Sequence, residues 1–368
     1  MLRRSKVILK KSSSRPDWLL IGLTLGLTVF GVLMVGNASV VEAYRDFGDK
    51  VYYLRLQSLW AGIGLMALFL TLNFHYRNWR KLALPLMVLA LISLIFLFFT
   101  GLGVQALGAK RWLRLGNFRF QPSELAKFAF ILWSAAFLSQ KKKTGPFLIL
   151  LALLVFLIML QPDLGTTLIL VLNGLIIWFA AGVAIWQIGL VGILGVLLGA
   201  GLIFSSSYRK ERLLTFLNPG RDPLGASYHI RQILIALGSG GLFGLGLGQS
   251  RQKFEYLPEA ATDSIFAVIA EEIGFIGASV LILIYLILIW RGLRITQQAP
   301  DNFSRLLAVG ITAWIGIQAL VNLAAMVALV PLTGVPLPFI SYGGSSLVLA
   351  LTGAGILANI SRYRVVKK

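Results

Sequence analysis

Few ionisable side chains interrupt the apolar stretches of this chain, and each is a candidate for chemistry. Glu124 and Lys127 stand three residues apart in an apolar run that opens with Gln121 and Pro122, so they share one face of a helix. Ionisable groups in the apolar phase are costly and usually functional, which favours a role in binding a polar substrate. The alternative is an ion pair in an exposed first turn, worth only about 0.3–0.5 kcal/mol.

Two aspartates stand where one apolar run gives way to the next. Asp163 lies in QPDLGT and Asp263 lies in LPEAATDS, each just before a new apolar run. Either can be a helix N-cap, for which aspartate is a preferred residue, or a carboxylate that faces a substrate. Glu271 and Glu272 follow two turns after Asp263, and at least one of them is expected to pair with a Lys or Arg.

The segment 331–346 contains three prolines and three glycines, which prevent a continuous helix. Irregular backbone at membrane depth survives only where protein buries it or a wet cavity meets it. Its Gly and Ser amides are able to form an anion-binding nest. The alternative is a packed structural turn.

The composition places these residues in a membrane protein. The chain has 368 residues, of which 57% are hydrophobic and 13% are charged. Those values exclude both an ordinary soluble globule and a disordered chain. The absence of cysteine excludes disulfides, thiolate metal sites and cysteine nucleophiles, and two histidines are too few for a histidine-based metal site. A net charge of +20 suggests nucleic acid in a soluble protein, but in a membrane protein it also serves topology and anionic lipid.

Hydropathy predicts an all-α, polytopic membrane protein with about ten transmembrane helices and one large outer loop, about 205–263. Nine or eleven spans stay open as alternatives. We expect a basic tail over 1–16 and a single transmembrane domain over 17–368. The spacing of Gly22 and Gly26, and of Gly195 and Gly199, predicts close helix packing. The ten stretches are about 18–38, 56–74, 82–100, 122–139, 146–160, 164–183, 187–204, 270–290, 304–330 and 343–361.

The distribution of basic residues predicts that both termini are cytoplasmic. With the N-terminus inside, nineteen Lys and Arg residues fall inside and fourteen outside, half of the latter in the long loop, which obeys the positive-inside rule poorly. This topology puts four unusual features on the outer side: Glu124, Asp163, Asp263 and segment 331–346. The basic residues Lys110, Arg111, Arg114 and Arg119 lie there too. A polar cavity ringed by cations is therefore expected, which suits an anionic ligand at the outer surface.

Five motifs together resemble the SEDS family, the FtsW/RodA/SpoVE group of peptidoglycan glycosyltransferases. They occur in the family's order, and with the ten-span pattern they cover nearly the whole chain. GLGLGQSRQK looks more like the division branch (FtsW, SpoVE) than the elongation branch (RodA). The motifs are QPSELAK (121–127), QPDLGT (161–166), GLGLGQSRQK (244–253), LPEAATD (257–263) with Glu271 and Glu272, and PLPFISYGGSS (336–346).

The resemblance implies polymerisation of lipid II at the outer face of the bacterial cytoplasmic membrane. An acceptor sugar hydroxyl attacks the anomeric carbon of the donor, and lipid pyrophosphate leaves. The family's essential aspartate falls on Asp263 as the general base, which needs to reach the hydroxyl by a hydrogen bond. Cations would offset the departing charge, with Lys127, Arg111 and Arg212 as candidates. The predicted substrate-binding residues are Glu124, Lys127, Arg111, Arg212, Gln121 and Asp163.

Two positions depart from the family pattern and bear on how Asp263 is held. Ala261 stands where the family usually has His or Gln, and Ser264 where it usually has Phe. No protein-bound metal is expected, although a divalent cation is compatible with a pyrophosphate substrate. The expected partners are lipid II, a class B penicillin-binding protein and other division or elongation proteins, with no nucleic acid.

Two other functions compete with the glycosyltransferase. A lipid II flippase or other polar-lipid transporter would need polar groups at the midplane and access from both sides. The polar groups here lie mostly near the predicted outer face, which favours the enzyme. A non-catalytic scaffold of a division complex is the third possibility, and a buried Glu124–Lys127 pair argues against it only weakly.

Overall fold

Ten apolar helices form in the places where the hydropathy predicts them. The computed structural model describes residues 15–99, 103–106, 109–115, 118–140, 144–204, 207–218, 225, 227–254 and 256–363. Six of the helices in these ranges are long and apolar enough to cross a membrane, and others are shorter. The ten are α1 (Trp18–Ala38), α3 (Tyr52–Asn73), α4 (Trp79–Phe99), α5 (Pro122–Leu138), α6 (Gly145–Met159), α7 (Leu164–Ala180), α8 (Ile185–Phe204), α11 (Ile265–Gln297), α12 (Asn302–Met326) and α13 (Gly344–Ser361). The predicted all-α membrane fold is confirmed.

The connections hold elements that hydropathy did not predict. The segment before α5 folds into a small antiparallel sheet of order β1-β2-β3. The large loop between α8 and α11 contains two helices. The strands are β1 (Gly103–Ala106), β2 (Ala109–Leu115) and β3 (Phe118–Phe120), and the additional helices are α2 (Val40–Phe47), the 3₁₀ turn η1 (Tyr76–Asn78), α9 (Ser207–Leu217) and α10 (Tyr228–Ser239).

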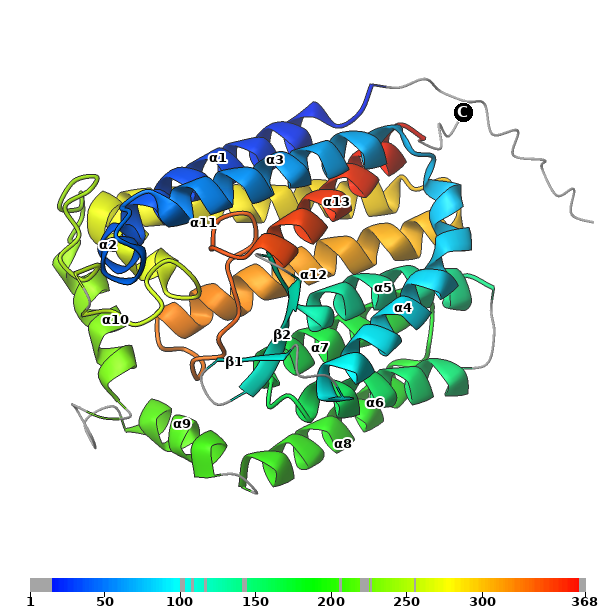
Figure 1. The fold of residues 1–368 in the computed structure, drawn as a ribbon. Helices are drawn as coiled ribbons and strands as arrows, with labels where there is room; N and C mark the ends of the chain where they lie inside the picture. Colours follow the sequence, from blue (N-terminus) through cyan, green and yellow to red (C-terminus); the bar gives the residue numbers. More distant parts are fainter. Residues whose placement is uncertain are drawn as a thin grey trace, which may run out of the picture.

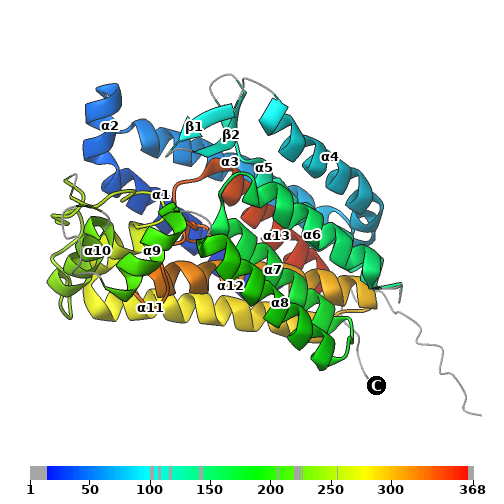
Figure 2. The ribbon, with the colours of Figure 1, turned by 90° about the horizontal axis from the view of Figure 1, so that it is seen from below.

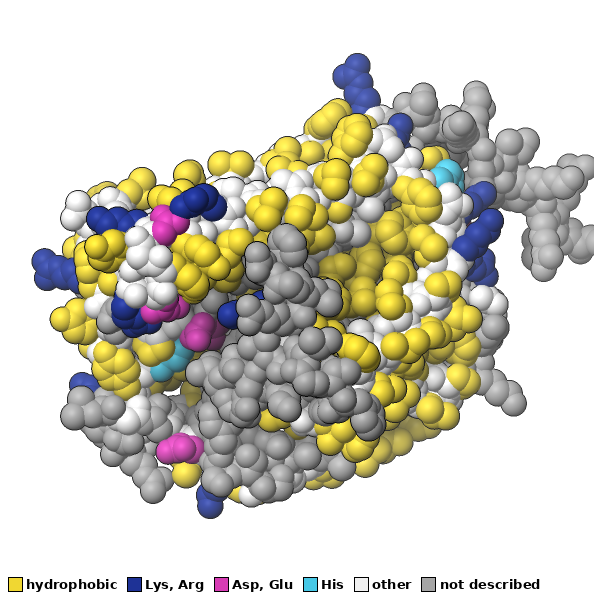
Figure 3. All heavy atoms as spheres, viewed as in Figure 1, with side chains coloured by type: hydrophobic (Ala, Val, Ile, Leu, Met, Phe, Trp, Pro, Cys, Tyr) yellow, Lys and Arg dark blue, Asp and Glu magenta, His cyan; other side chains and the backbone are white. Residues whose placement is uncertain are grey.

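The helices run side by side, and the two described ends of the chain meet at one end of the bundle (Figures 1 and 2). The backbone N–H of Asp17 donates to Ser361 Oγ at 2.9 Å. The Asp17 carboxylate also pairs with Arg291 Nη2 at 2.5 Å. A chain that crosses a membrane an even number of times also ends on the side where it began, in agreement with these contacts. On the face that Figure 3 shows, charged side chains gather toward the two ends of the molecule, and the described surface between them is mostly hydrophobic.

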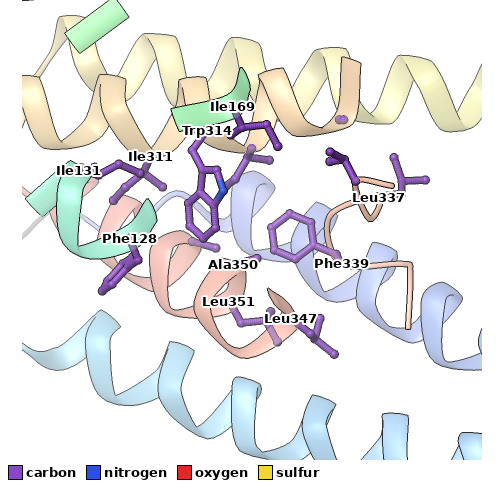
Figure 4. Close-up of a cluster of buried hydrophobic side chains, with 14 of the residues drawn as sticks. Phe128, Ile131, Ile169, Ile311, Trp314, Leu337, Phe339, Leu347, Ala350 and Leu351 are labelled. Atoms are coloured by element: carbon purple, nitrogen blue, oxygen red, sulfur yellow. The ribbon is translucent and has the colours of Figure 1, made fainter. Parts of the chain in front are cut away.

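The core of the bundle surrounds Trp314 of α12, which is 1% exposed. Side chains of α5, α7, α12 and α13 surround it, and two residues of the irregular segment before α13, Leu337 and Phe339, join the same cluster (Figure 4). Phe339 has φ +67°, a left-handed conformation that is costly for a side chain of this size. Its burial at 2% exposure anchors the irregular segment in the core.

The glycines that carry close packing are not the pairs expected from spacing. Among the residues that the structure describes, no neighbouring atom lies within 4 Å of a Cβ built on Gly22, Gly26, Gly195 or Gly199, so that prediction is wrong. Sequence spacing does not reveal which face of a helix meets another. The close approach occurs instead at positions such as Gly31, where a Cβ would lie 2.6 Å from Phe339 O.

Helix α11 is broken at Gly274, which has φ 70° and ψ −174°. The break frees backbone groups that the segment before α11 takes up. The N–H groups of Leu245 and Gly246 donate to the carbonyls of Glu271 and Glu272, at 3.0 Å each. In return, the N–H of Phe275 donates to Gly241 O at 2.9 Å. This exchange fixes the glycine-rich loop, residues 240–248, against the N-terminal part of α11.

We expect Gly274→Ala to lower thermal stability markedly, because a Cβ there would lie 2.3 Å from Gly244 N in a backbone conformation that favours glycine. Strain of this kind costs about 1–3 kcal/mol before the clash is added. The matched control is Gly22→Ala, which meets nothing within 4 Å and replaces glycine by the better helix former. Melting temperatures in detergent should fall for the first variant and hold or rise for the second; equal values would contradict the account of the break.

Candidate functional site

Asp263 lies just outside the start of α11, between two fixed contacts. Its backbone carbonyl accepts from Asn322 Nδ2 of α12 at 2.7 Å. On its other side, the Thr262 hydroxyl is 3.2 Å from Asp263 Oδ1 and 2.6 Å from Glu259 Oε2. The N-cap of α11 is Ser264, so Asp263 does not serve as the cap. Its partly exposed side chain is thus placed at the N-terminus of α11.

Ser264, the departure from the family pattern, is fully buried and has a polar partner. His229 Nε2 of α10 lies 2.7 Å from Ser264 Oγ. The hydroxyl makes no capping bond to its own helix. A polar contact to α10 therefore occupies the position next to Asp263.

The irregular segment 331–343 is held by buried side chains because prolines leave its carbonyls without helical partners. Asn322 Nδ2 donates to Val335 O at 2.8 Å, and Gln318 Nε2 donates to Pro336 O at 3.0 Å. Tyr285 OH donates to Pro338 O at 2.5 Å. The expectation of a packed turn is confirmed, and the predicted anion nest stays a prediction.

This segment touches the loop that carries Asp263 as well as the start of α7. The Tyr342 N–H donates to Ala261 O at 2.9 Å. Burial raises the pKa of Tyr342 to about 12, so its hydroxyl stays neutral at physiological pH. A Cβ on Gly165, in the first turn of α7, would lie 2.5 Å from Thr333 O. The irregular segment therefore lies between the two aspartates.

Glu124 and Lys127 form a buried ion pair rather than an exposed first-turn pair. Their N···O distance is 2.7 Å, and each side chain is 2% exposed. Lys127 Nζ also donates to Gln318 Oε1 at 3.1 Å and lies 5.8 Å from the centre of the Trp314 ring. Glu124 Oε2 has no hydrogen-bond partner among the described residues. An unsatisfied buried carboxylate oxygen is uncommon in a native interior.

Asp163 and Arg111 adopt structural roles next to each other. Asp163 is the N-cap of α7 and accepts from Thr166 N at 3.0 Å and Thr166 Oγ1 at 2.8 Å. Arg111 of β2 donates from Nε to Gln161 O at 3.1 Å and from Nη2 to Pro162 O at 2.6 Å. The capping alternative for Asp163 is thus confirmed, while the predicted contact of either residue with substrate stays a prediction.

The other predicted site residues are placed less fully. Gln121 precedes α5, and its backbone N–H donates to Ser345 Oγ of α13 at 3.1 Å. Arg212 belongs to α9, but its side chain lies outside the described residues, as do the side chains of Lys110 and Arg114. Arg119 is exposed on β3. The structure therefore brings the motif segments to one end of the bundle without placing every cation predicted there.

A second buried cluster holds the glycine-rich loop. Glu272 Oε1 pairs with Lys253 Nζ at 3.3 Å, which confirms the expected pairing of this acidic doublet. Lys253 Nζ also donates to Asn37 Oδ1 of α1 at 2.8 Å. Glu271 Oε2 accepts from Ser250 Oγ at 2.5 Å, and Glu271 is 1% exposed. These carboxylates anchor the loop and are saturated by protein donors, so they are structural.

Sequence reasoning missed the two amides of α12, Gln318 and Asn322. The charge pattern singles out ionisable residues within the apolar spans and gives no weight to neutral polar residues there. The signal was available: two amide side chains four residues apart in an apolar helix, with exposed fractions of 2% and 1% in the structure. Among the described residues, no group of three or more His, Cys, Asp or Glu side chains is placed to hold a metal ion.

Comparison with known proteins agrees with this arrangement. Residues 17–365 match the family described as cell cycle protein, FtsW/RodA/SpoVE. The chain is 44% identical to stage V sporulation protein E of Bacillus subtilis over 362 residues, covering 96% of this chain and 98% of that protein. It is 41% identical to a probable peptidoglycan glycosyltransferase FtsW of Geobacter sulfurreducens over 359 residues, covering 95% and 96%.

Solved structures of similar fold include the rod shape determining protein RodA of Thermus thermophilus, with a TM-score of 0.69, 31% identity, and coverage of 95% of this chain and 97% of that one. A chain from a study of polymerisation and crosslinking by a peptidoglycan synthase complex gives a TM-score of 0.75 at 31% identity, covering 94% and 98%. The helices, the buried motif residues and these similarities lead to one conclusion: the chain is a multi-pass protein of the bacterial inner membrane and belongs to the FtsW/RodA/SpoVE family.

Proposed function

We propose that this protein polymerises lipid II into glycan strands at the outer face of the cytoplasmic membrane, as a peptidoglycan glycosyltransferase. The observation that carries the proposal is the meeting of Asp263, the Glu124–Lys127 pair and segment 331–343 at one end of a hydrophobic bundle. A lipid with a polar head group and a polyprenyl tail needs both, because the head group binds polar residues and the tail lies against an apolar surface. The similarity to proteins named probable peptidoglycan glycosyltransferase supports the same function.

In the proposed reaction, Asp263 is the general base. It takes the proton of the acceptor hydroxyl as that oxygen bonds to the donor's anomeric carbon, and the bond to the pyrophosphate oxygen breaks. The pyrophosphate leaves with the electron pair and needs nearby cations. Arg111 uses two of its five N–H donors on backbone carbonyls, so it keeps three donors and its charge for this purpose. Lys127, with Glu124 and Gln318 as partners, keeps one donor.

A divalent cation is compatible with this site. Mg²⁺ usually keeps several waters and takes one or two carboxylates together with substrate phosphates. Asp263 and Glu259 supply two carboxylates, one on each side of the Thr262 hydroxyl. A bound cation would offset the charge of the pyrophosphate. We also propose a class B penicillin-binding protein and other division or elongation proteins as partners, because one structural relative comes from a peptidoglycan synthase complex.

Asp263→Asn keeps the size of the side chain but removes its basicity, so glycan synthesis from labelled lipid II should fall roughly 10²–10⁴-fold. The assay uses the purified full-length protein with its cognate class B penicillin-binding protein. The control is Asp49→Asn, which removes a partly exposed carboxylate paired with Arg55 and should leave the rate unchanged. Wild-type protein that makes no glycan, or an Asp263→Asn variant that makes as much, would refute the proposal. Lipid translocation by that variant in vesicles would instead support a transporter.

The buried ion pair provides a test that separates stability from function. Removing one partner, as in Glu124→Gln or Lys127→Met, leaves a buried charge and should cost about 3–5 kcal/mol of stability. The double variant Glu124→Gln/Lys127→Met has no such charge and should recover most of the melting temperature. If the pair binds substrate, the double variant stays at least tenfold less active; full activity would show that the pair only supports the fold.

We propose that both termini are cytoplasmic, that 1–16 is a basic cytoplasmic tail and that 17–368 is one transmembrane domain. The chain has no cysteine, so single-cysteine labelling reports topology without background. An impermeant maleimide should label Lys50→Cys in intact spheroplasts, because Lys50 is exposed at the predicted outer end. Asn78→Cys, exposed at the opposite end, should react only after permeabilisation. The reverse labelling pattern would contradict the proposal and show that both termini lie outside.

A further inference from the structure

One face of α12 carries polar side chains at regular spacing through the core. Trp314, Gln318 and Asn322 are four residues apart, so they follow one another along the same side of the helix. Their exposed fractions are 1%, 2% and 1%. Buried amides are costly unless they are bonded, so their partners show what this face holds together.

The hydrogen-bonding capacity of the Gln318 side chain is completely used. Its Oε1 accepts from Lys127 Nζ at 3.1 Å and from Trp314 Nε1 at 3.0 Å. Its Nε2 donates to Pro336 O at 3.0 Å and to Ser346 Oγ at 3.5 Å. Two lone pairs and two hydrogens are all that an amide offers. Gln318 therefore links the ammonium of α5 to the irregular segment before α13.

Asn322 makes the corresponding link on the next turn. Its Nδ2 donates one hydrogen to Asp263 O at 2.7 Å and the other to Val335 O at 2.8 Å. Val335 and Pro336 are consecutive, so the two amides of α12 hold two consecutive carbonyls. A continuous path then runs from Lys127 through Gln318, the 335–336 backbone and Asn322 to Asp263.

We propose that Gln318 and Asn322 are positioning residues that fix Lys127 and Asp263 relative to each other through the 335–336 backbone. The proposal rests on the proposed function, because it concerns the cation and the base of that reaction. Neither amide needs to touch substrate. Group transfer is sensitive to placement, and a shift of about 1 Å at the reacting groups can cost 10²-fold in rate. A path of buried hydrogen bonds restricts such shifts.

The first test replaces amides by carboxyl groups of the same shape. Asn322→Asp removes both donations, and Gln318→Glu keeps an acceptor for Lys127 and removes the donation to Pro336. The matched control is Asn359→Asp at the other end of the bundle, where Asn359 donates to Leu72 O at 2.7 Å and accepts from Tyr76 N at 3.0 Å, with 1% exposure. All three variants bury a new carboxyl group, so their generic cost to stability is similar.

Kinetics of lipid II polymerisation then separate positioning from folding. The two α12 variants should lower kcat at least tenfold with KM within threefold, while Asn359→Asp keeps kcat within twofold despite a comparable loss of melting temperature. The double variant Gln318→Glu/Asn322→Asp should lose no more kcat than the worse single variant, because both act through one path. Additive losses, or an equal effect at Asn359, would overturn the proposal. Asn322→Ser keeps one donor and should show an intermediate kcat; a wild-type value would also overturn it.

A second measurement does not depend on activity. The hydrogen bonds of Gln318 reach no residue of 257–264, the segment that carries Asp263. If the path transmits position, Gln318→Glu should nevertheless speed amide hydrogen exchange in 257–264 as well as in 331–343. Faster exchange confined to 331–343 would overturn the proposal, even if the enzyme is active, because it would show that Gln318 does not influence the segment that carries Asp263. Failure of wild-type polymerisation with the exchange result intact would instead refute only the proposed function.

Discussion

The irregular backbone of 331–343 is the constraint on which the rest of the site depends. Prolines keep it from forming a helix, and no bulk water is available inside a bundle to satisfy its carbonyls. Side chains of three helices take that role: Tyr285 of α11, and Gln318 and Asn322 of α12, with Gln57 of α3 donating to Ser341 O at 3.3 Å. The segment can be irregular only because polar groups in neighbouring apolar helices receive it.

This requirement also explains why the site lies at one end of the bundle. The helices α3, α11 and α12 converge there on 331–343, and that segment in turn contacts the loop before α11 through Tyr342. Asp263 is therefore held by backbone contacts while its carboxylate stays partly exposed. The role proposed for Asp263, that of a general base, requires a carboxyl group that is both fixed in place and accessible to its substrate.

The sequence predicted the helices well because a run of about 20 apolar residues is rare outside membrane-spanning helices. It predicted the bounds of α11 poorly: the expected span of 270–290 became Ile265–Gln297, because hydropathy marks an apolar stretch and does not report how far the helix continues beyond it. Asp263 and the Glu124–Lys127 pair were singled out as candidates by their charge in an apolar sequence, and the role expected of Asp263 came from the family resemblance. The small sheet, the interlocked break at Gly274 and the α12 amides depend on contacts between distant segments, which no local pattern reports.

Two buried sets of hydrogen bonds hold α11 in place, one at Glu271 and Glu272 and the other at Asn322. Glu271 and Glu272 bind the glycine-rich loop near the break in α11, and Asn322 binds the backbone just before the N-terminus of α11. Both sets use charged or amide side chains, which membrane helices normally exclude, so each carries a desolvation cost that its hydrogen bonds offset. These polar groups give no evident gain in stability over apolar residues, because apolar packing would hold a helix equally well. What they add is a defined position: a hydrogen bond to a specific carbonyl sets direction as well as distance, whereas an apolar contact does not.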